Sequence, residues 1–129
     1  MLLRPFIAVK AWLGGFYKLT TTEENYGNVT AVHYDSGKIA WRVKTSEPMV
    51  GGVLATAGGL VFTGEADGWF KAYHAVDGAV LWKFQAGAGV NAPPSSYSID
   101  GRQYVVVAAG GNTPLNSKRG DAIIAFALD

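Results

Sequence analysis

The two histidines, His33 and His74, are the first residues that could do chemistry, because imidazole binds metal ions and transfers protons near neutral pH. They stand at matching positions of two similar segments, 41 residues apart (74 minus 33). Equivalent positions in neighbouring repeats are too far apart to share one metal ion. We therefore expect both histidines to be turn residues rather than metal ligands.

A second pair of candidates is Glu65 and Asp67, which lie in a short segment between two apolar stretches. Two carboxylates this close could contribute oxygen ligands to a Ca²⁺ ion, but we favour a solvated turn. The Gly87-Ala88-Gly89 segment lacks the strand–turn–helix context of a dinucleotide-binding loop. There is no cysteine, and no arrangement of Ser, His and Asp supports hydrolysis. We therefore identify neither a metal site nor a catalytic group in this sequence.

The composition is that of a folded and nearly neutral chain. Of its 129 residues, 49% are hydrophobic and 16% are charged, and the formal net charge is +1. This excludes a disordered tail and gives no electrostatic reason to expect nucleic acid or an anionic membrane surface as a partner. No apolar run reaches the ~20 residues of a membrane-spanning helix. Residues 1–10 faintly resemble a signal peptide, but Pro5 and Lys10 interrupt the apolar stretch, so we expect no targeting segment.

An internal repeat organises most of the chain. Residues 31–41 and 72–82 share Ala, His, Gly and Trp at a constant spacing of 41, and Gly27 and Gly68 have the same separation. Residues 121–126 match the beginning of the pattern a third time. Five matched positions in one register predict a repeat protein.

Each repeat unit is predicted to be β-structure. β-branched and aromatic residues fill short stretches, and glycine-containing segments separate them. The expected hairpins are residues 53–63, 69–84 and 95–108, the last with an Asp100-Gly101 turn. No stretch keeps a helical period over a dozen residues. Four strands in about 41 residues is the size of one β-propeller blade. We predict an all-β fold: a partial β-propeller of about two and a half four-stranded antiparallel blades.

About three units of this size cannot close a ring, since propellers have about four to eight blades. We therefore expect residues 25–129 to be the C-terminal blades of a longer propeller. Residues 1–24 are expected to be a poorly matching lead-in or a broken upstream blade. The open strand edges are expected to pair with the remainder of the propeller or with other copies of the chain.

The twice-occurring pattern Ala-x5-Gly-x3-Trp resembles the tryptophan-docking motif of the eight-bladed quinoprotein propellers. Longer strings are similar to the late blades and the C-terminal end of the pyrroloquinoline quinone (PQQ)-dependent alcohol and methanol dehydrogenases. These strings are GGVLATAGGLVFTG (residues 51–64), LWKFQAG (81–87), DGRQYV (100–105) and RGDAIIAFAL (119–128). The resemblance runs over residues 25–129.

The resemblance implies an enzyme family that oxidises alcohols in the periplasm. In this family PQQ lies on the propeller axis with Ca²⁺ or a lanthanide, an Asp acts as base, and a cytochrome or a quinone accepts the electrons. The base and the metal ligands belong to earlier blades, and no segment of this chain matches them. We therefore expect the isolated chain to be inactive and to bind no cofactor alone.

The resemblance also implies roles for two groups of residues. The docking residues, which would join adjacent blades, are Ala31, Gly37, Trp41, Ala72, Gly78 and Trp82. The candidates for facing the cofactor rim are Val50, Gly51 and Asn91. Many relatives have a tryptophan at the position of Val50, and valine cannot donate a hydrogen bond. His33 and His74 stand where the docking motif usually has Asp. Residues 112–118 interrupt the last repeat and are expected to form a surface loop on the same rim.

We interpret the chain as the C-terminal segment of a PQQ-dependent alcohol dehydrogenase that completes the propeller and lines the cofactor rim. The alternative is a non-catalytic β-propeller scaffold or protein-interaction module, such as the lipoprotein of the outer-membrane assembly machinery. A catalytic Asp and a metal-ligand motif upstream of Met1 would favour the dehydrogenase.

Overall fold

The computed structural model describes residues 25–128, and all regular structure within them is β-strand. The expected lead-in, residues 1–24, lies outside the described residues. The strands are β1 (Gly27–Val32), β2 (Ile39–Thr45), β3 (Val53–Ala55), β4 (Leu60–Gly64), β5 (Trp69–His74), β6 (Val80–Gln85), β7 (Ser95–Ile99), β8 (Arg102–Ala109) and β9 (Ala122–Leu128). Over this part of the chain there is no helix long and apolar enough to cross a membrane.

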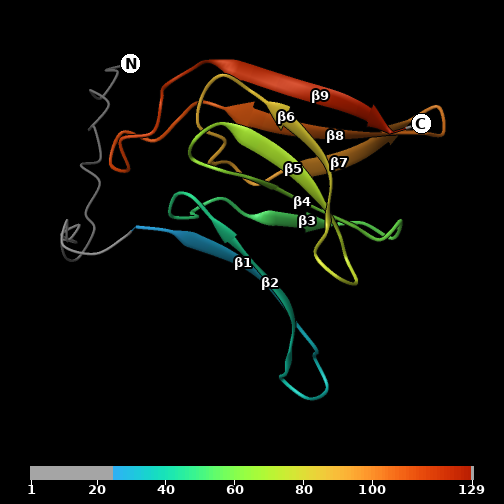
Figure 1. Cartoon of the computed structure of the whole chain (residues 1–129). Coiled ribbons are helices and arrows are strands. Elements are labelled where there is room, and N and C mark those ends of the chain that lie inside the picture. The colour runs from blue at the N-terminus through green and yellow to red at the C-terminus, as the bar shows by residue number, and fades with distance from the viewer. Residues whose placement is uncertain (1–24, 129) are drawn as a thin grey trace, which may run out of the picture.

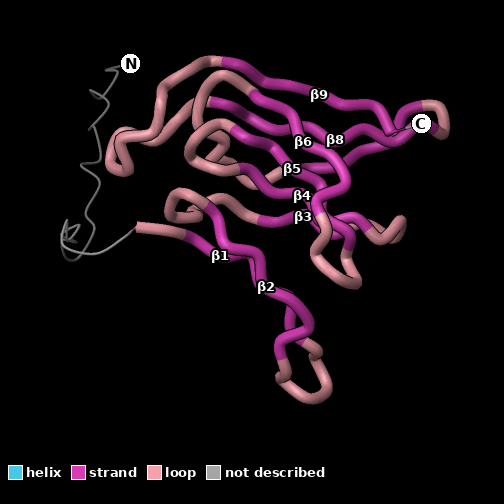
Figure 2. Tube along the Cα trace, in the orientation of Figure 1, coloured by secondary structure: helices cyan, strands magenta, loops and turns pink. Residues whose placement is uncertain are grey.

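The described strands form three antiparallel sheets that pack against one another (Figure 1). Their strand orders are β1-β2, β3-β4-β5-β6 and β7-β8-β9, and Figure 2 shows how loops connect them. The middle sheet is a complete four-stranded blade, and the flanking sheets contribute two and three strands. The predicted all-β fold, a partial propeller of about two and a half blades, is confirmed.

The 41-residue repeat corresponds to the outer hairpin of a blade. The β1-β2 hairpin pairs Ala31 with Trp41, and the β5-β6 hairpin pairs Ala72 with Trp82. In both hairpins the register shifts directly after that alanine. The turn glycine has a φ of 67° in the first hairpin and 74° in the second, a region that strains residues with side chains. The sequence repeat is therefore also a repeat of turn geometry.

The predicted Asp-Gly turn joins β7 to β8. Asp100 and Gly101 have φ values of 51° and 78°, and Ile99 pairs with Arg102 on either side of them. Two successive positive φ values are typical of the type I′ turn, whose twist suits antiparallel strands. The β7-β8 turn therefore lies at the residues that the sequence predicted.

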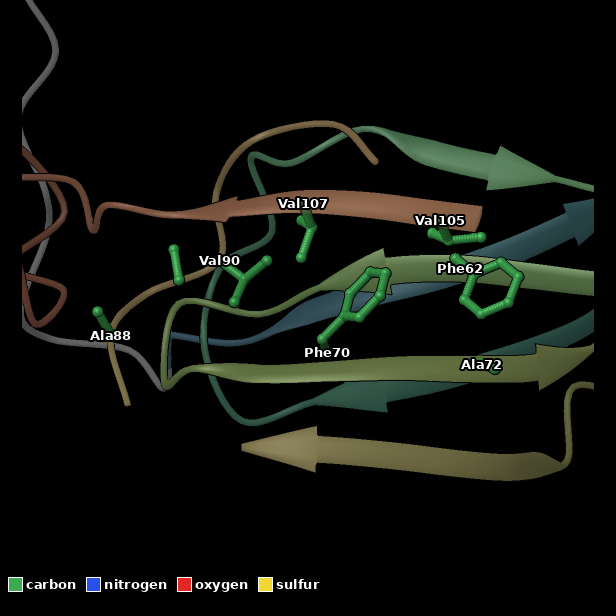
Figure 3. Packing of buried hydrophobic residues seen from close by; sticks show 8 residues of the cluster. Phe62, Phe70, Ala72, Ala88, Val90, Val105 and Val107 are labelled. Atoms are coloured by element: carbon green, nitrogen blue, oxygen red, sulfur yellow. The ribbon is translucent and has the colours of Figure 1, made fainter. Parts of the chain in front are cut away.

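Two apolar clusters hold the sheets together. The larger cluster lies between the middle and the last sheet and is centred on Phe70, Val90 and Val105, which are fully buried (Figure 3). The smaller cluster, between the first and the middle sheet, contains Trp41 and Tyr73. Strand β5 contributes to both clusters, because successive residues of a strand point to opposite faces of the sheet. Strand β5 is thus buried on both faces of the middle sheet, whereas β6 at its edge is exposed along its whole length.

Candidate functional site

Four connections meet at one end of the three sheets and form the surface that we call the rim (Figure 1, left side). They are residues 46–52 between β2 and β3, residues 65–68 between β4 and β5, residues 86–94 between β6 and β7, and residues 110–121 between β8 and β9. The segments around Val50 and Asn91, which the sequence assigned to a cofactor-facing edge, both belong to this rim. Loops held by a rigid scaffold commonly carry functional residues.

The rim brings two of the three cofactor-facing candidates together. A Cβ atom placed on Gly51 would lie 3.5 Å from the carbonyl oxygen of Asn91. The next residue is packed more tightly, since a Cβ on Gly52 would lie 2.7 Å from the Cβ of Pro93. A side chain at Gly52 would therefore collide with Pro93, whereas a Cβ at Gly51 would only be in van der Waals contact with Asn91. The side chain of Val50, beside them, is 52% exposed.

The loop of residues 112–118 is attached to the connection that carries Asn91. Asn91 Nδ2 donates a hydrogen bond to Ser117 Oγ at 3.0 Å, and Asn112 N donates to the same oxygen at 2.6 Å. The side chain of Asn91 is therefore engaged within the rim. Sequence reasoning expected a surface loop here and did not identify Ser117 as the residue that anchors it.

Glu65 is buried at the rim, with 1% of its surface exposed. Its Oε1 accepts a hydrogen bond from Tyr73 OH at 3.2 Å and forms an ion pair with Lys71 Nζ. Lys71 and Tyr73 reach it together because residues two apart lie on the same face of a strand. The prediction of a solvated turn is therefore wrong for Glu65, whose charge is satisfied inside the protein, although the neighbouring Asp67 is exposed.

The surroundings of Tyr73 in this polar cluster raise the pKa of its phenol. Burial raises the pKa of Tyr73 well above its usual value, and the negative charge of Glu65 and the hydrogen bond to it raise that pKa further. The Tyr73 phenol therefore stays neutral and keeps donating to the carboxylate. Among the described residues no buried side-chain nitrogen or oxygen lacks a hydrogen-bond partner. The cluster is a closed polar contact rather than an open catalytic group.

The histidines lie at the start of two separate hairpin turns: His33 directly follows β1, and His74 is the last residue of β5. The carbonyl oxygen of His33 accepts from Gly37 N, and that of His74 accepts from Gly78 N. His74 Nδ1 also lies 2.9 Å from Asp77 Oδ1. The prediction of a turn residue is therefore confirmed for His33, which lies outside the strands, but not for His74, which still pairs with Leu60 in the sheet. Within residues 25–128 there is no group of three or more His, Cys, Asp or Glu that could hold a metal ion.

The two repeat tryptophans both lie between sheets but differ in burial. Trp41 is 8% exposed, and its Nε1 donates to the carbonyl oxygen of Ala75 at 2.9 Å. A Cβ on Gly78 would come within 2.7 Å of the Trp41 ring, so the ring covers that glycine. Trp82 is 39% exposed, and its ring centroid lies 4.9 Å from that of Phe126. The docking role of the motif residues stays a prediction.

Residues 4–105 match a PQQ protein family described as the glucose/ethanol/alcohol dehydrogenase β-propeller domain. The quinoprotein ethanol dehydrogenase of Pseudomonas aeruginosa is 47% identical over an alignment of 108 residues that covers 81% of this chain and 17% of that protein.

Two solved structures resemble the chain in three dimensions. The quinohemoprotein alcohol dehydrogenase from Comamonas testosteroni has a TM-score of 0.67 at 37% identity, over 79% of this chain and 16% of that one. A europium-containing methanol dehydrogenase has a TM-score of 0.65 at 36% identity, over 70% and 16%. This chain thus spans about a sixth of the length of the proteins it matches. Over that span, the chain belongs to the β-propeller domain family of the PQQ-dependent glucose, ethanol and alcohol dehydrogenases.

Proposed function

We propose that the chain is a late section of the propeller of a PQQ-dependent alcohol dehydrogenase, where it completes the ring and lines part of the cofactor-facing rim. The family match and the 47% identity to an ethanol dehydrogenase support this proposal. The observation that carries the rim assignment is that the segments preceding β3 and β7 lie against each other, Gly51 beside Asn91 and Gly52 tightly against Pro93.

The rim has features that fit a flat quinone. Gly51 presents bare backbone, which a planar ring can approach closely. Val50 is half-exposed and adds an apolar surface beside that backbone. When bound, PQQ takes up the hydride of the alcohol, and the protein supplies binding and orientation. Asn91, whose side-chain amide donates a hydrogen bond to Ser117, would shape this surface by holding the segment before β7 in place.

The remaining parts of the enzyme would lie outside the described residues. We propose that the Asp base and the ligands of Ca²⁺ or a lanthanide belong to segments upstream of this chain. A cytochrome or a quinone would accept the electrons, and the enzyme would act in the periplasm. The quinohemoprotein and the europium-containing relatives support these choices at the level of the family.

The repeat residues would join adjacent blades. Trp41 covers the glycine of the next blade and donates to a carbonyl of the same turn, which is a contact that a docking residue must make. We assign this role to the six motif residues: Ala31, Gly37, Trp41, Ala72, Gly78 and Trp82.

PQQ-dependent alcohol oxidation tests the proposal. The chain, joined to the segment encoded directly upstream of Met1, is reconstituted with PQQ and either Ca²⁺ or a lanthanide. We expect dye-linked oxidation of a primary alcohol, and about tenfold weaker PQQ binding for Gly51→Val, because a side chain would fill the space beside the quinone. Gly58→Val is the matched control, since a Cβ there meets only Thr56 Oγ1, at 3.8 Å, in the β3-β4 turn.

Two results together would contradict the proposal. One is an upstream segment without an Asp base or metal-ligand motif, and the other is a protein that binds no PQQ. The non-catalytic scaffold would then be the better assignment.

A further inference from the structure

Three Asp-Gly pairs lie in connections between the described strands: Asp67-Gly68, Asp77-Gly78 and Asp100-Gly101. A glycine directly after an aspartate favours a reaction of the side chain with the main chain, because glycine has no side chain to shield its amide nitrogen. That nitrogen can attack the carboxyl carbon of the aspartate and close a five-membered succinimide ring. In a folded protein the reaction requires a carboxyl group and a peptide plane that are free to move.

The Asp67-Gly68 pair is held in place. The carbonyl oxygen of this peptide accepts a hydrogen bond from Gln85 Nε2 at 3.3 Å, and its nitrogen donates to the carbonyl oxygen of Glu65 at 3.1 Å. The carboxylate is fixed as well, since Oδ1 accepts from Trp69 N and Oδ2 accepts from Ser46 Oγ. Ring closure would have to break several of these bonds at once.

The Asp77-Gly78 pair is restrained by its own turn and by the next hairpin. The peptide nitrogen donates to the carbonyl oxygen of His74 at 2.9 Å, and the ring of Trp41 covers the buried glycine. The carboxylate accepts from Ala79 N and lies against His74 Nδ1, and these contacts lower the pKa of Asp77. Ring closure expels a carboxyl oxygen as water and therefore needs the protonated carboxyl group, which a lowered pKa makes scarcer.

The Asp100-Gly101 pair has none of these restraints. It forms the β7-β8 turn at the end of the sheets opposite the rim, and both of its residues are exposed (Figure 1). A Cβ placed on Gly101 would meet no atom within 4 Å. Within residues 25–128, no hydrogen bond or ion pair holds the carboxylate of Asp100 or the amide nitrogen of Gly101.

The backbone of this turn is also close to the geometry of the ring. Asp100 has a φ of 51°, which suits the first central residue of both hairpin turn types, I′ and II′. Rotating the peptide plane between Asp100 and Gly101 converts type I′ into type II′, in which the first central residue has a ψ of about −120°. At this ψ the next nitrogen lies beside the side-chain carboxyl carbon. Ile99 and Arg102, which pair on either side, keep their positions during the rotation.

We propose that Asp100 is a site of spontaneous isomerisation, at which the Gly101 nitrogen closes a succinimide with the carboxyl carbon of Asp100 and water reopens the ring to isoaspartate. In the first step the C–N bond forms, a C–O bond breaks, and the amide proton leaves with the hydroxyl group as water. In the second step water adds to one of the two ring carbonyls. Attack at the side-chain carbonyl restores aspartate, and attack at the main-chain carbonyl gives isoaspartate. One water is lost and one is gained, so the reaction needs no other reactant.

The modification changes the turn, because the main chain of isoaspartate runs through Cβ and is longer by one methylene group. Ile99 and Arg102 are the last paired residues before the turn, so their pairing would be disturbed first. Strand β7 pairs only with β8 among the described strands, and all of its residues are exposed. We therefore expect isoaspartate at position 100 to loosen β7 and to leave the middle sheet unchanged.

Isotope labelling tests the site, because reopening of the ring adds one solvent oxygen to the residue. The chain is kept in H₂¹⁸O at about pH 5, where part of the carboxyl groups is still protonated. One sample is folded and one is unfolded in guanidinium chloride, and both are kept until half of the Asp-Gly pairs in the unfolded sample carry the label. After return to ordinary water, trypsin places the three pairs on separate peptides, residues 45–71, 72–83 and 84–102.

We expect similar labelling of the three pairs in the unfolded chain, where no fold restrains them. In the folded chain, Asp100 should react at least about tenfold faster than Asp67 and Asp77 and should stay within about tenfold of its own unfolded rate. Fragmentation of the 84–102 peptide should locate the label on Asp100. Protein isoaspartyl methyltransferase, which methylates isoaspartate but not aspartate, should modify this peptide. Amide hydrogen exchange along β7 should be about tenfold faster in the modified protein.

Gly101→Asn provides a variant that keeps the turn. Asparagine tolerates a positive φ, but its side chain obstructs the attacking nitrogen, so labelling of Asp100 should fall about tenfold. Gly58→Asn is the matched control in the β3-β4 turn and should leave the labelling of Asp100 unchanged. Circular dichroism verifies that both variants are folded.

Three results would each overturn the proposal. The first is a rate at Asp100 in the folded chain that is less than about tenfold above that of either other pair. The second is a folded rate more than about tenfold below the unfolded rate, which would show that the turn blocks ring closure. The third is equal labelling of the parent and Gly101→Asn. None of these measurements involves PQQ, so the result is independent of the proposed function.

Discussion

Trp41→Ala should destabilise the chain far more than Trp82→Ala, although the two tryptophans occupy the same position of the repeat. Trp41 is 8% exposed, and truncating a buried tryptophan to alanine costs about 3–5 kcal/mol. The substitution also removes the donor to the carbonyl oxygen of Ala75, which adds about 1 kcal/mol. We therefore expect Trp41→Ala to lower the free energy of unfolding by about 4–6 kcal/mol.

Trp82→Ala removes less buried side-chain surface than Trp41→Ala does. With 39% of Trp82 already exposed to water, the burial contribution falls in proportion, to about 2–3 kcal/mol. Trp41→Phe separates packing from hydrogen bonding, because phenylalanine can still cover Gly78 but has no N–H for Ala75. We expect it to cost about 1–2 kcal/mol.

Urea-induced unfolding at one fixed protein concentration, followed by circular dichroism, gives these differences by linear extrapolation. If Trp41→Ala is already unfolded without urea, Trp41→Phe provides the comparison with Trp82→Ala. Equal losses for the two alanine variants would refute the reasoning, since they would show that cover by the next blade's turn contributes nothing. If the Trp41→Phe variant were as stable as the parent, the hydrogen bond from Trp41 to Ala75 would make no measurable contribution to stability.

The polar cluster, the rim loop and the open edges yield the remaining predictions. Because folding raises the pKa of Tyr73, the unfolded chain loses that phenol proton first, so the free energy of unfolding should fall above about pH 10, by up to about 1.4 kcal/mol per pH unit. Tyr73→Phe should lack this component, and an unchanged slope in a pH series of urea titrations would contradict it. Lys71→Met leaves Glu65 buried without its cation and should cost about 2–3 kcal/mol, part of which Glu65→Leu in the same chain restores; a loss below about 0.5 kcal/mol would mean that water screens the pair. Ser117→Ala should speed amide exchange at Asn112 about tenfold, and Ser117→Thr should restore the slow rate; unchanged rates would show that other contacts hold the loop. The isolated chain should associate at micromolar concentration, and a sharp monomer in sedimentation velocity would argue against open edges.

The strands could be predicted because local signals and the repeat agree. Asp100-Gly101 predicted the β7-β8 turn, since these residue types tolerate two successive positive φ values. The constant spacing from turn glycine to tryptophan predicted equivalent hairpins, and the pairing of Ala31 with Trp41 indeed recurs in the second hairpin. Each signal acts over fewer than a dozen residues, which is why the sequence is sufficient for it.

The candidate site was predictable only where it follows the blade pattern. Gly51 and Asn91 lie in the connections that precede equivalent inner strands, β3 and β7, so strand order alone assigned them to one rim, and the structure brings them together. Ser117 contacts Asn91 across 26 residues from a loop that has no counterpart in the other repeats. A contact of that kind depends on how the loop folds back, and no periodicity encodes it.

The burial of Glu65 could not be predicted from the sequence for a different reason. A carboxylate between two strands is usually solvated, and only its partners on β5 reverse that preference. The alternation of Lys71 and Tyr73 was a usable signal, because it places a cation and a hydrogen-bond donor on the same face, two residues apart. The alternation does not show that the first sheet covers this face. That cover keeps water away from the ion pair and so favours it.

The two tryptophans show that a repeat determines which contacts a residue can make, and the neighbouring blade determines which of them form. Trp41 and Trp82 have the same pairing on their own strands and an aromatic ring of the next blade beside each. Their exposure differs because one faces a complete blade and the other a blade with three described strands. In repeat proteins such interfaces carry much of the stability. Covering the exposed ring of Trp82 would therefore also stabilise β9, which contacts it through Phe126, and with β9 the loop that Ser117 attaches to Asn91. Because β8 and β9 carry both the open strand edge and the ends of this loop, local unfolding of that edge should also weaken the hydrogen bond between Asn91 and Ser117.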